Sequence, residues 1–87
     1  MLSEFIDQKV VVDFRGEYVL LGTLVKIDDH FLELRHADLH DLRDTDTDRE
    51  NYVAASVRTG IKRNRKRVIV MRAEVVAVSL MDDVTEV

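Results

Sequence analysis

The segment that most constrains this chain is residues 18–34, YVLLGTLVKIDDHFLEL. Apolar side chains occupy both alternation classes of its first half, as expected of a central strand that is covered on both faces. Gly22 interrupts this strand, and a glycine there permits sharp coiling or the close approach of another backbone. Residues 28–30 (DDH) then supply a turn, because an Asp side chain can bond the backbone two residues on. We therefore predict a long bent strand, a tight turn and a second strand.

Strand patterns also surround this segment. Residues 9–14 (KVVVDF) are rich in β-branched side chains, and residues 31–35 alternate cleanly between apolar and charged side chains. Two apolar strands follow at 68–71 and 75–81, joined by a tight connection at 72–74. A short amphipathic helix is predicted at the N-terminus from the spacing of Leu2, Phe5 and Ile6. We predict a mainly β fold, a small, strongly bent barrel of five antiparallel strands.

A helical insertion is predicted between the third and fourth strands, at about residues 37–66 of a single domain that spans 1–87. Its first part carries six acidic residues between Asp38 and Glu50. We predict that this part is a solvated loop, and we call it the acidic excursion. Thr47 and Glu50 have the spacing of a capping box, and Gly60 would end the helix that follows. One face of this helix would carry Tyr52, Val53, Ser56 and Val57. The acidic tail from Asp82 to Val87 is expected to be loose.

Composition excludes several classes of protein. There is no cysteine, which rules out disulfides and cysteine-based zinc sites. The formal charge of −4 argues against a general affinity for nucleic acids or anionic membranes. No secretory or membrane-spanning pattern is present. We expect a soluble, cytoplasmic protein with no membrane partner.

The two apolar strands near the C-terminus predict self-association. The chain has no proline, so nothing blunts the exposed edges that these strands would leave on a monomer. A ring of identical subunits, joined edge to edge, would cover those edges. We therefore expect a homo-oligomer.

Three groups of residues resemble the Sm-like (Lsm) family, and they lie in the family's order along the chain. They are Val10, Val12 and Phe14 followed by Gly16 and Glu17; then Gly22, Leu24, Ile27, Asp28, His30 and Phe31; then Val70, Met71, Arg72, Ala73 and Val76. Members of this family are bent five-stranded barrels of the SH3-like type, with an N-terminal helix, that form rings and bind RNA. The resemblance implies a homo-oligomeric ring of about five to seven subunits.

The resemblance also implies an RNA-binding site at two loops. His30 and Arg72 would clamp a base between an imidazole and a guanidinium plane, and Asp28 would hold the loop. Leu32 stands where the family usually has an asparagine that bonds a base, and Ala73 stands where a glycine is usual. In the alternative interpretation, Asp28 and His30 are ordinary turn residues and Arg72 is a solvated arginine.

A basic stretch supplies further candidates for RNA binding. Five of the six residues from 62 to 67 are cationic, and they could contact several phosphates. They are Lys62, Arg63, Arg65, Lys66 and Arg67. The alternative is a solvated loop that pairs with the acidic excursion before it.

Catalysis and metal binding have little support. His36 and His40 would share one face of a helix, with Asp41 and Asp44 nearby, but the glutamate of a zinc hydrolase motif is missing. There is no glycine-rich phosphate loop, no cysteine nucleophile and no serine in a nucleophile elbow. We predict no enzyme activity and no cofactor.

The favoured function is RNA binding by an Sm-like ring, and the alternative is a structural or assembly module that binds protein partners through the insertion.

Overall fold

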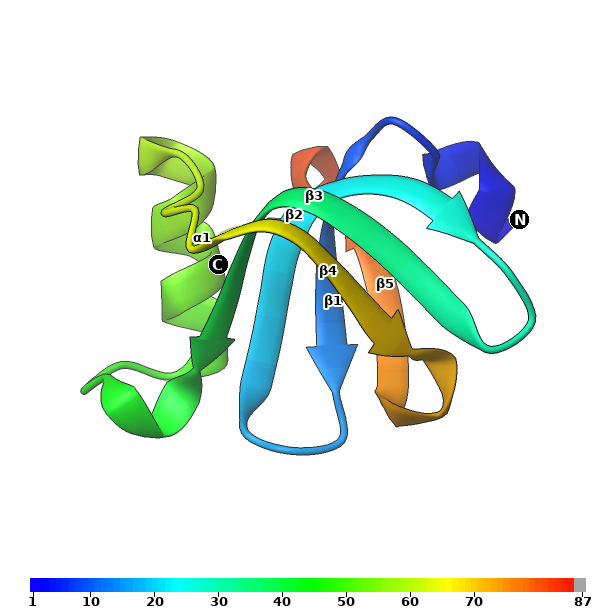
Figure 1. Cartoon of the computed structure of the whole chain (residues 1–87). Coiled ribbons are helices and arrows are strands. Elements are labelled where there is room, and N and C mark those ends of the chain that lie inside the picture. Colours follow the sequence, from blue (N-terminus) through cyan, green and yellow to red (C-terminus); the bar gives the residue numbers. More distant parts are fainter. Residues whose placement is uncertain (86–87) are drawn as a thin grey trace.

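The computed structural model describes residues 1–85 and contains one antiparallel sheet of five strands (Figure 1). The strands are β1 (Lys9–Phe14), β2 (Tyr18–Ile27), β3 (Phe31–Asp41), β4 (Arg65–Met71) and β5 (Val75–Leu80). The α-helix is α1 (Arg49–Thr59), and short 3-10 helices form at Leu2–Phe5, Leu42–Asp44, Arg72–Glu74 and Met81–Asp83. The order of the strands in the sheet is β4-β3-β2-β1-β5.

The mainly β class and the central place of β2 are confirmed. β2 lies in the middle of the strand order, with β1 and β3 on its two sides. The sheet is strongly curved (Figure 1). It does not close into a barrel, because β4 and β5 remain its two edges. The predicted N-terminal helix is a single 3-10 segment, Leu2–Phe5.

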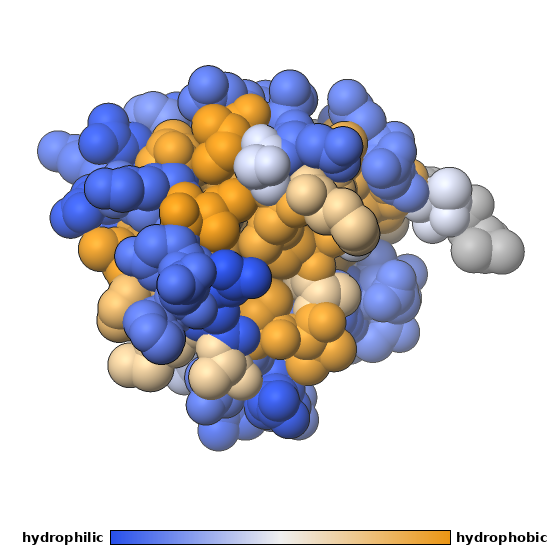
Figure 2. Space-filling view, turned by 90° about the vertical axis from the view of Figure 1, so that its right-hand side faces the viewer, coloured by the Kyte–Doolittle hydropathy of each residue, from blue (hydrophilic) through white to orange (hydrophobic). Residues whose placement is uncertain are grey.

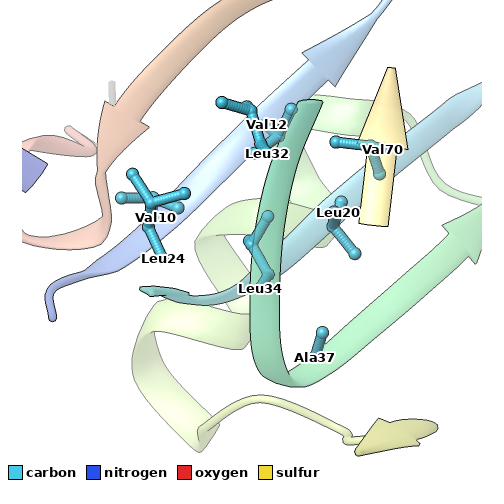
Figure 3. Close-up of a cluster of buried hydrophobic side chains, with 8 residues drawn as sticks. All are labelled: Val10, Val12, Leu20, Leu24, Leu32, Leu34, Ala37 and Val70. Carbon is cyan, nitrogen blue, oxygen red and sulfur yellow. The ribbon is translucent and has the colours of Figure 1, made fainter. Parts of the chain in front are cut away.

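Side chains are buried on both faces of β2, as its sequence predicts. Leu20 and Leu24 point into the concave side of the sheet, where eight buried residues form the main core (Figure 3). Val19 and Leu21 point the other way and pack with Val53 of α1. The insertion helix therefore covers the outer face of the sheet, at the left of Figure 1.

The bend of the sheet is built around Gly22. Leu21 pairs with Asp38 and Thr23 with Arg35, so two residues of β3 lie opposite this one glycine, which is a β-bulge. The first of the two, His36, has a φ of 51°. A Cβ on Gly22 would lie 2.9 Å from the Cβ of Ala37. The close approach of a second backbone, which the sequence predicts at this glycine, is confirmed.

The boundaries of the insertion differ from the prediction. β3 was expected to end at Arg35, but it continues to Asp41, and β4 begins at Arg65, inside the basic stretch. The insertion is therefore shorter than the predicted 37–66. The reason is that β2 has ten residues, and its first half pairs with the polar second half of β3, up to the contact of Tyr18 with Asp41.

The predicted helix is confirmed, but its N-cap is different. Asp48 is the N-cap, and its side chain accepts a hydrogen bond from the backbone N–H of Asn51. The predicted capping box of Thr47 and Glu50 is therefore wrong, because the helix begins one residue later. Gly60 ends the helix with a φ of 95°, as predicted.

One face of α1 is buried, though it is narrower than expected. Val53 and Ser56 are buried, whereas Val57, expected beside them, is 41% exposed. The C-terminal tail is also more ordered than predicted as far as Val84, because Asp82 and Asp83 lie in a 3-10 turn and Val84 packs against the cluster that contains Val53. The last two residues of that predicted tail, Glu86 and Val87, lie outside the described residues.

Candidate nucleic-acid interface

The turn between β2 and β3 is fixed by Asp28. Its Oδ1 accepts hydrogen bonds from the backbone N–H groups of His30 and Phe31, at 2.8 and 2.7 Å. These two bonds, and to a smaller extent the nearby charges of His30 and Lys26, hold the pKa of Asp28 below its usual value. The Asp-led turn predicted from the sequence is confirmed. It presents the exposed His30 side chain at one end of the sheet.

Arg72 joins this turn to the connection between β4 and β5. Its backbone N–H donates to the carbonyl oxygen of His30 at 2.8 Å, and its guanidinium Nη1 donates to the carbonyl oxygen of Asp28 at 2.6 Å. The structure therefore brings Arg72 to Asp28 and His30, although Arg72 lies 44 residues after Asp28 in the sequence. Ala73, which stands where the family pattern has glycine, adopts an ordinary negative φ, so no glycine is required there.

Phe31 adds an exposed aromatic ring that the sequence analysis did not assign to the site. It is 43% exposed, and its ring lies edge-on to His30 with centroids 6.4 Å apart. Across the sheet it pairs with Met71, which is 63% exposed. The signal was available, because the alternation of residues 31–35 places Leu32 and Leu34 inside and therefore Phe31 outside. Leu32 is 1% exposed and cannot bond a base.

The basic stretch lies away from these loops. On β4, Met71 pairs with Phe31 beside the turn, whereas Arg65 pairs with Ala37 at the bend of β3. Six residues of strand separate the two pairs, a distance of about 20 Å at roughly 3.3 Å per residue. The candidate residues therefore form two groups, which we name the loop site (Asp28, His30, Phe31 and Arg72) and the basic bend (His36 and residues 62–66).

Arg67 belongs to neither group. Its Nη2 donates to Oε1 of Glu33 at 3.1 Å, and Arg35 lies 3.5 Å from the other carboxylate oxygen. The bond from Arg67, more than the charge of Arg35, lowers the pKa of Glu33. The charge of Arg67 is thus already neutralised by Glu33 on the neighbouring strand β3. Arg67 is therefore a weaker candidate for phosphate contact than the other four cations of the stretch.

The acidic excursion does not neutralise the basic bend. The segment around Asp44–Asp48 and the segment around Lys62 lie at opposite ends of α1 (Figure 1). That helix has 11 residues and is about 16 Å long. Among the residues that the structure describes, Lys62, Arg63 and Lys66 form no ion pair. The predicted alternative of an internally paired charged loop is wrong.

The two histidines with the spacing of helical metal ligands, His36 and His40, do not share a helix face. Both lie in β3, where His36 occupies the bulge and His40 stacks on the ring of Tyr52, with centroids 3.8 Å apart. Within residues 1–85 there is no group of three or more potential ligands that could hold a metal ion.

Apolar surface extends over the side of the molecule that carries the N-terminal helix and the β2–β3 turn. Figure 2 shows it as a broad orange band between hydrophilic patches. The large exposed apolar residues of the two edge strands are Ile69 and Met71 on β4 and Val76 on β5, with exposed fractions of 49%, 63% and 66%. None of the helices in the described part of the chain has the length and apolar character needed to cross a membrane.

Neither a known protein-family model nor a curated protein sequence matches this chain.

Proposed function

We propose that this protein is an Sm-like, ring-forming protein that binds RNA, or another single-stranded nucleic acid, at the loop site. The observation that carries the proposal is the pair of hydrogen bonds from Arg72 to the β2–β3 turn. They hold a guanidinium group, an imidazole and a phenyl ring within one small surface. Planar cationic and aromatic side chains are the groups on which unpaired bases stack.

Binding at this site should tolerate different bases. Leu32 is buried, so the position at which the family pattern has a base-reading asparagine offers no polar group. Stacking on His30, Phe31 and Arg72 depends on the π-face that every base has. Phosphate contacts from the basic bend would add affinity that falls with salt.

The two free edges of the open sheet support an edge-to-edge assembly. β4 and β5 are the free edges, and each exposes apolar side chains. If β5 of one copy paired with β4 of the next, the sheet would continue through a ring and the exposed apolar area would be covered. A ring of about five to seven subunits would repeat the loop site and raise the affinity for a long strand.

Light scattering on the purified protein, alone and with short uridine-rich and adenine-rich RNAs, tests both parts of the proposal. We expect a stable oligomer that binds both RNAs with similar affinity. Val76→Lys should dissociate it, because the substitution places a charge on the exposed edge of β5. A wild-type monomer would refute the ring, and an oligomer that ignores both RNAs would refute the nucleic-acid function.

The loop site itself is tested with variants of Arg72. Arg72→Ala should weaken RNA binding strongly, and Arg72→Lys should restore only part of it, because lysine keeps the charge but has no planar group to stack. The matched control is Arg43→Ala, which removes one positive charge from a residue beyond the end of β3. Equal effects of the Arg72→Ala and Arg43→Ala variants would show that only net charge matters.

A second candidate function is protein assembly through the insertion. It is favoured by Val57, an apolar side chain that α1 leaves 41% exposed on the outer side of the sheet. In that case Val57→Lys would abolish binding of a protein partner and leave RNA binding unchanged.

A further inference from the structure

The basic bend contains an open hollow of about 390 Å³ with an unusual lining. Four side chains line it, His36, Arg63, Arg65 and Lys66, and each of them can donate hydrogen bonds. No carboxylate is among them. A hollow of this composition suits an anion.

The cations around the hollow have no acidic partner to neutralise them. Lys66 and Arg63 form no ion pair among the described residues, and Arg65 donates only to the backbone carbonyl of Asn64, at 3.0 Å. Asp38 is a buried acid, and its two carboxylate oxygens already accept bonds from Tyr52 and Asn64. Three like charges held close together repel one another, so a bound anion would stabilise this arrangement.

The backbone that carries these cations is held in place. Asn64 donates from its backbone N–H to the carbonyl oxygen of Ala37, and its side-chain amide makes one bond to each backbone group of Leu39. Arg65 is the first residue of β4 and pairs with Ala37. Arg65 and Lys66 therefore stand on the start of β4, and Arg63 directly precedes the anchored Asn64. Holding these residues in place lowers the entropy cost of binding.

His36 enters the hollow because of the bulge. A left-handed φ is uncommon outside glycine, and the one at His36 is imposed by the close packing of β3 on Gly22. Local strain of this kind is often kept where a side chain has a functional position.

We propose that this hollow binds the terminal phosphate of an RNA strand. Arginine forks match phosphate oxygens in a bidentate manner, and three cationic side chains, Arg63, Arg65 and Lys66, line this one hollow. An internal phosphodiester carries a single negative charge, whereas a phosphomonoester carries about −1.5 to −2 at pH 7. Because several cations line one hollow, a compact anion of higher charge suits them better than a single internal phosphodiester does. The RNA source of the phosphate rests on the proposed function, but the phosphate chemistry of the hollow does not.

Two measurements on the full-length protein test this proposal. The first compares one RNA sequence with a 5′-phosphate, with a 3′-phosphate and with hydroxyl groups at both ends, by fluorescence anisotropy at low salt. A phosphate at one end should tighten binding about tenfold, the effect expected of a single charge-assisted hydrogen bond. The second measures the binding of inorganic pyrophosphate to the protein by calorimetry. We expect pyrophosphate to bind and to compete with the phosphate-ended RNA.

Variants separate the hollow from the loop site. Arg63→Ala with Arg65→Ala should remove the preference for a terminal phosphate, and Arg43→Ala should keep it. Arg72→Ala should weaken the binding of all three RNAs by the same factor and leave the ratio of their affinities unchanged. His36→Asn keeps a residue that tolerates a left-handed φ but removes the imidazole, so it tests the hollow even if the double variant fails to fold.

The outcomes are distinct. Equal affinities for the three RNAs, with no binding of pyrophosphate, would overturn the proposal. A double variant that loses affinity equally for all three RNAs would also overturn it, in favour of contacts along an internal backbone. If the wild type binds no RNA but binds pyrophosphate through Arg63 and Arg65, the phosphate site stands and the proposed RNA function fails.

Discussion

Replacing Tyr52 by phenylalanine tests how the insertion helix is attached to the sheet. The hydroxyl group of Tyr52 on α1 donates to Oδ2 of Asp38 on β3, and Asn64 donates to the other oxygen at 3.1 Å. Asp38 is only 2% exposed, so water cannot replace a lost donor. Phenylalanine keeps the ring on which His40 stacks, and the substitution therefore removes the hydroxyl group alone.

The magnitude follows from the burial of the carboxylate. A buried acceptor that loses its donor costs about 1–3 kcal/mol, and more when it is charged. With about 2 kcal/mol for Tyr52→Phe, and a shift of about 4–8 °C per kcal/mol in a domain of this size, the melting temperature should fall by about 8–16 °C.

Urea unfolding at a fixed protein concentration measures this effect, because assembly would otherwise couple stability to concentration. A double-mutant cycle of Tyr52→Phe with Asp38→Asn should give a coupling energy of about 1 kcal/mol or more. A Tyr52→Phe variant within about 0.5 kcal/mol of the wild type, the range of ordinary surface substitutions, would refute the reasoning. So would additive effects in the cycle.

The same bond predicts a loss of stability at alkaline pH. Burial, and then the bond to Asp38, raises the pKa of Tyr52 well above its ordinary value. The folded protein thus holds this phenolic proton more tightly than the unfolded chain does. Its contribution to stability is complete below about pH 10 and is lost as the pH rises towards the folded-state pKa. Tyr52→Phe should flatten this loss, and a variant that loses stability with the same slope as the wild type would contradict the assignment.

Three further substitutions test the fold by urea unfolding. Gly22→Ala should cost about 1–3 kcal/mol, because the new Cβ would lie 2.9 Å from that of Ala37, and a neutral result would refute the tight bulge. Asp48→Ala should cost about 1 kcal/mol and Thr47→Ala almost nothing; the reverse order would favour the capping box. Leu34→Ala should cost about 2–5 kcal/mol because Leu34 is fully buried, and a loss below 1 kcal/mol would place it outside the core.

The elements that the sequence predicts well are those with local signals. Runs of apolar residues give β1, β2 and the two edge strands, alternation gives the start of β3, and the Asp28 turn follows from the chemistry of one side chain. The second half of β3 has no such signal, because its HADLHD stretch is mostly polar. Asp38 is tolerated inside only through donors 14 and 26 residues away, Tyr52 and Asn64. No local pattern encodes those contacts.

The same distinction between local signals and distant contacts applies to the candidate site. The meeting of His30 with Arg72 follows from the order of the strands and could be anticipated from the family-like motifs. The separation of the basic stretch from that loop could not, because it depends on where β4 begins. Had β4 started at Val68, as its apolar residues suggest, all the cations would lie in a loop. Its start at Arg65 instead places Arg65, Lys66 and Arg67 in the strand, with Arg65 at the bend of β3.

The bend links the fold to the proposed phosphate site. Gly22 lets β3 pack closely enough to form the bulge, and the bulge both folds the sheet and gives His36 its left-handed φ. The carbonyl group of Ala37, the next residue, accepts the backbone bond that anchors Asn64 between the cations. His36, which lines the hollow, and Ala37, which belongs to the core, are therefore neighbours in β3, and Ala37 pairs with Arg65 of β4. For this reason a substitution that relaxes the bulge should disturb the hollow together with the core, whereas the loop site, about 20 Å away along the strand, should keep its geometry.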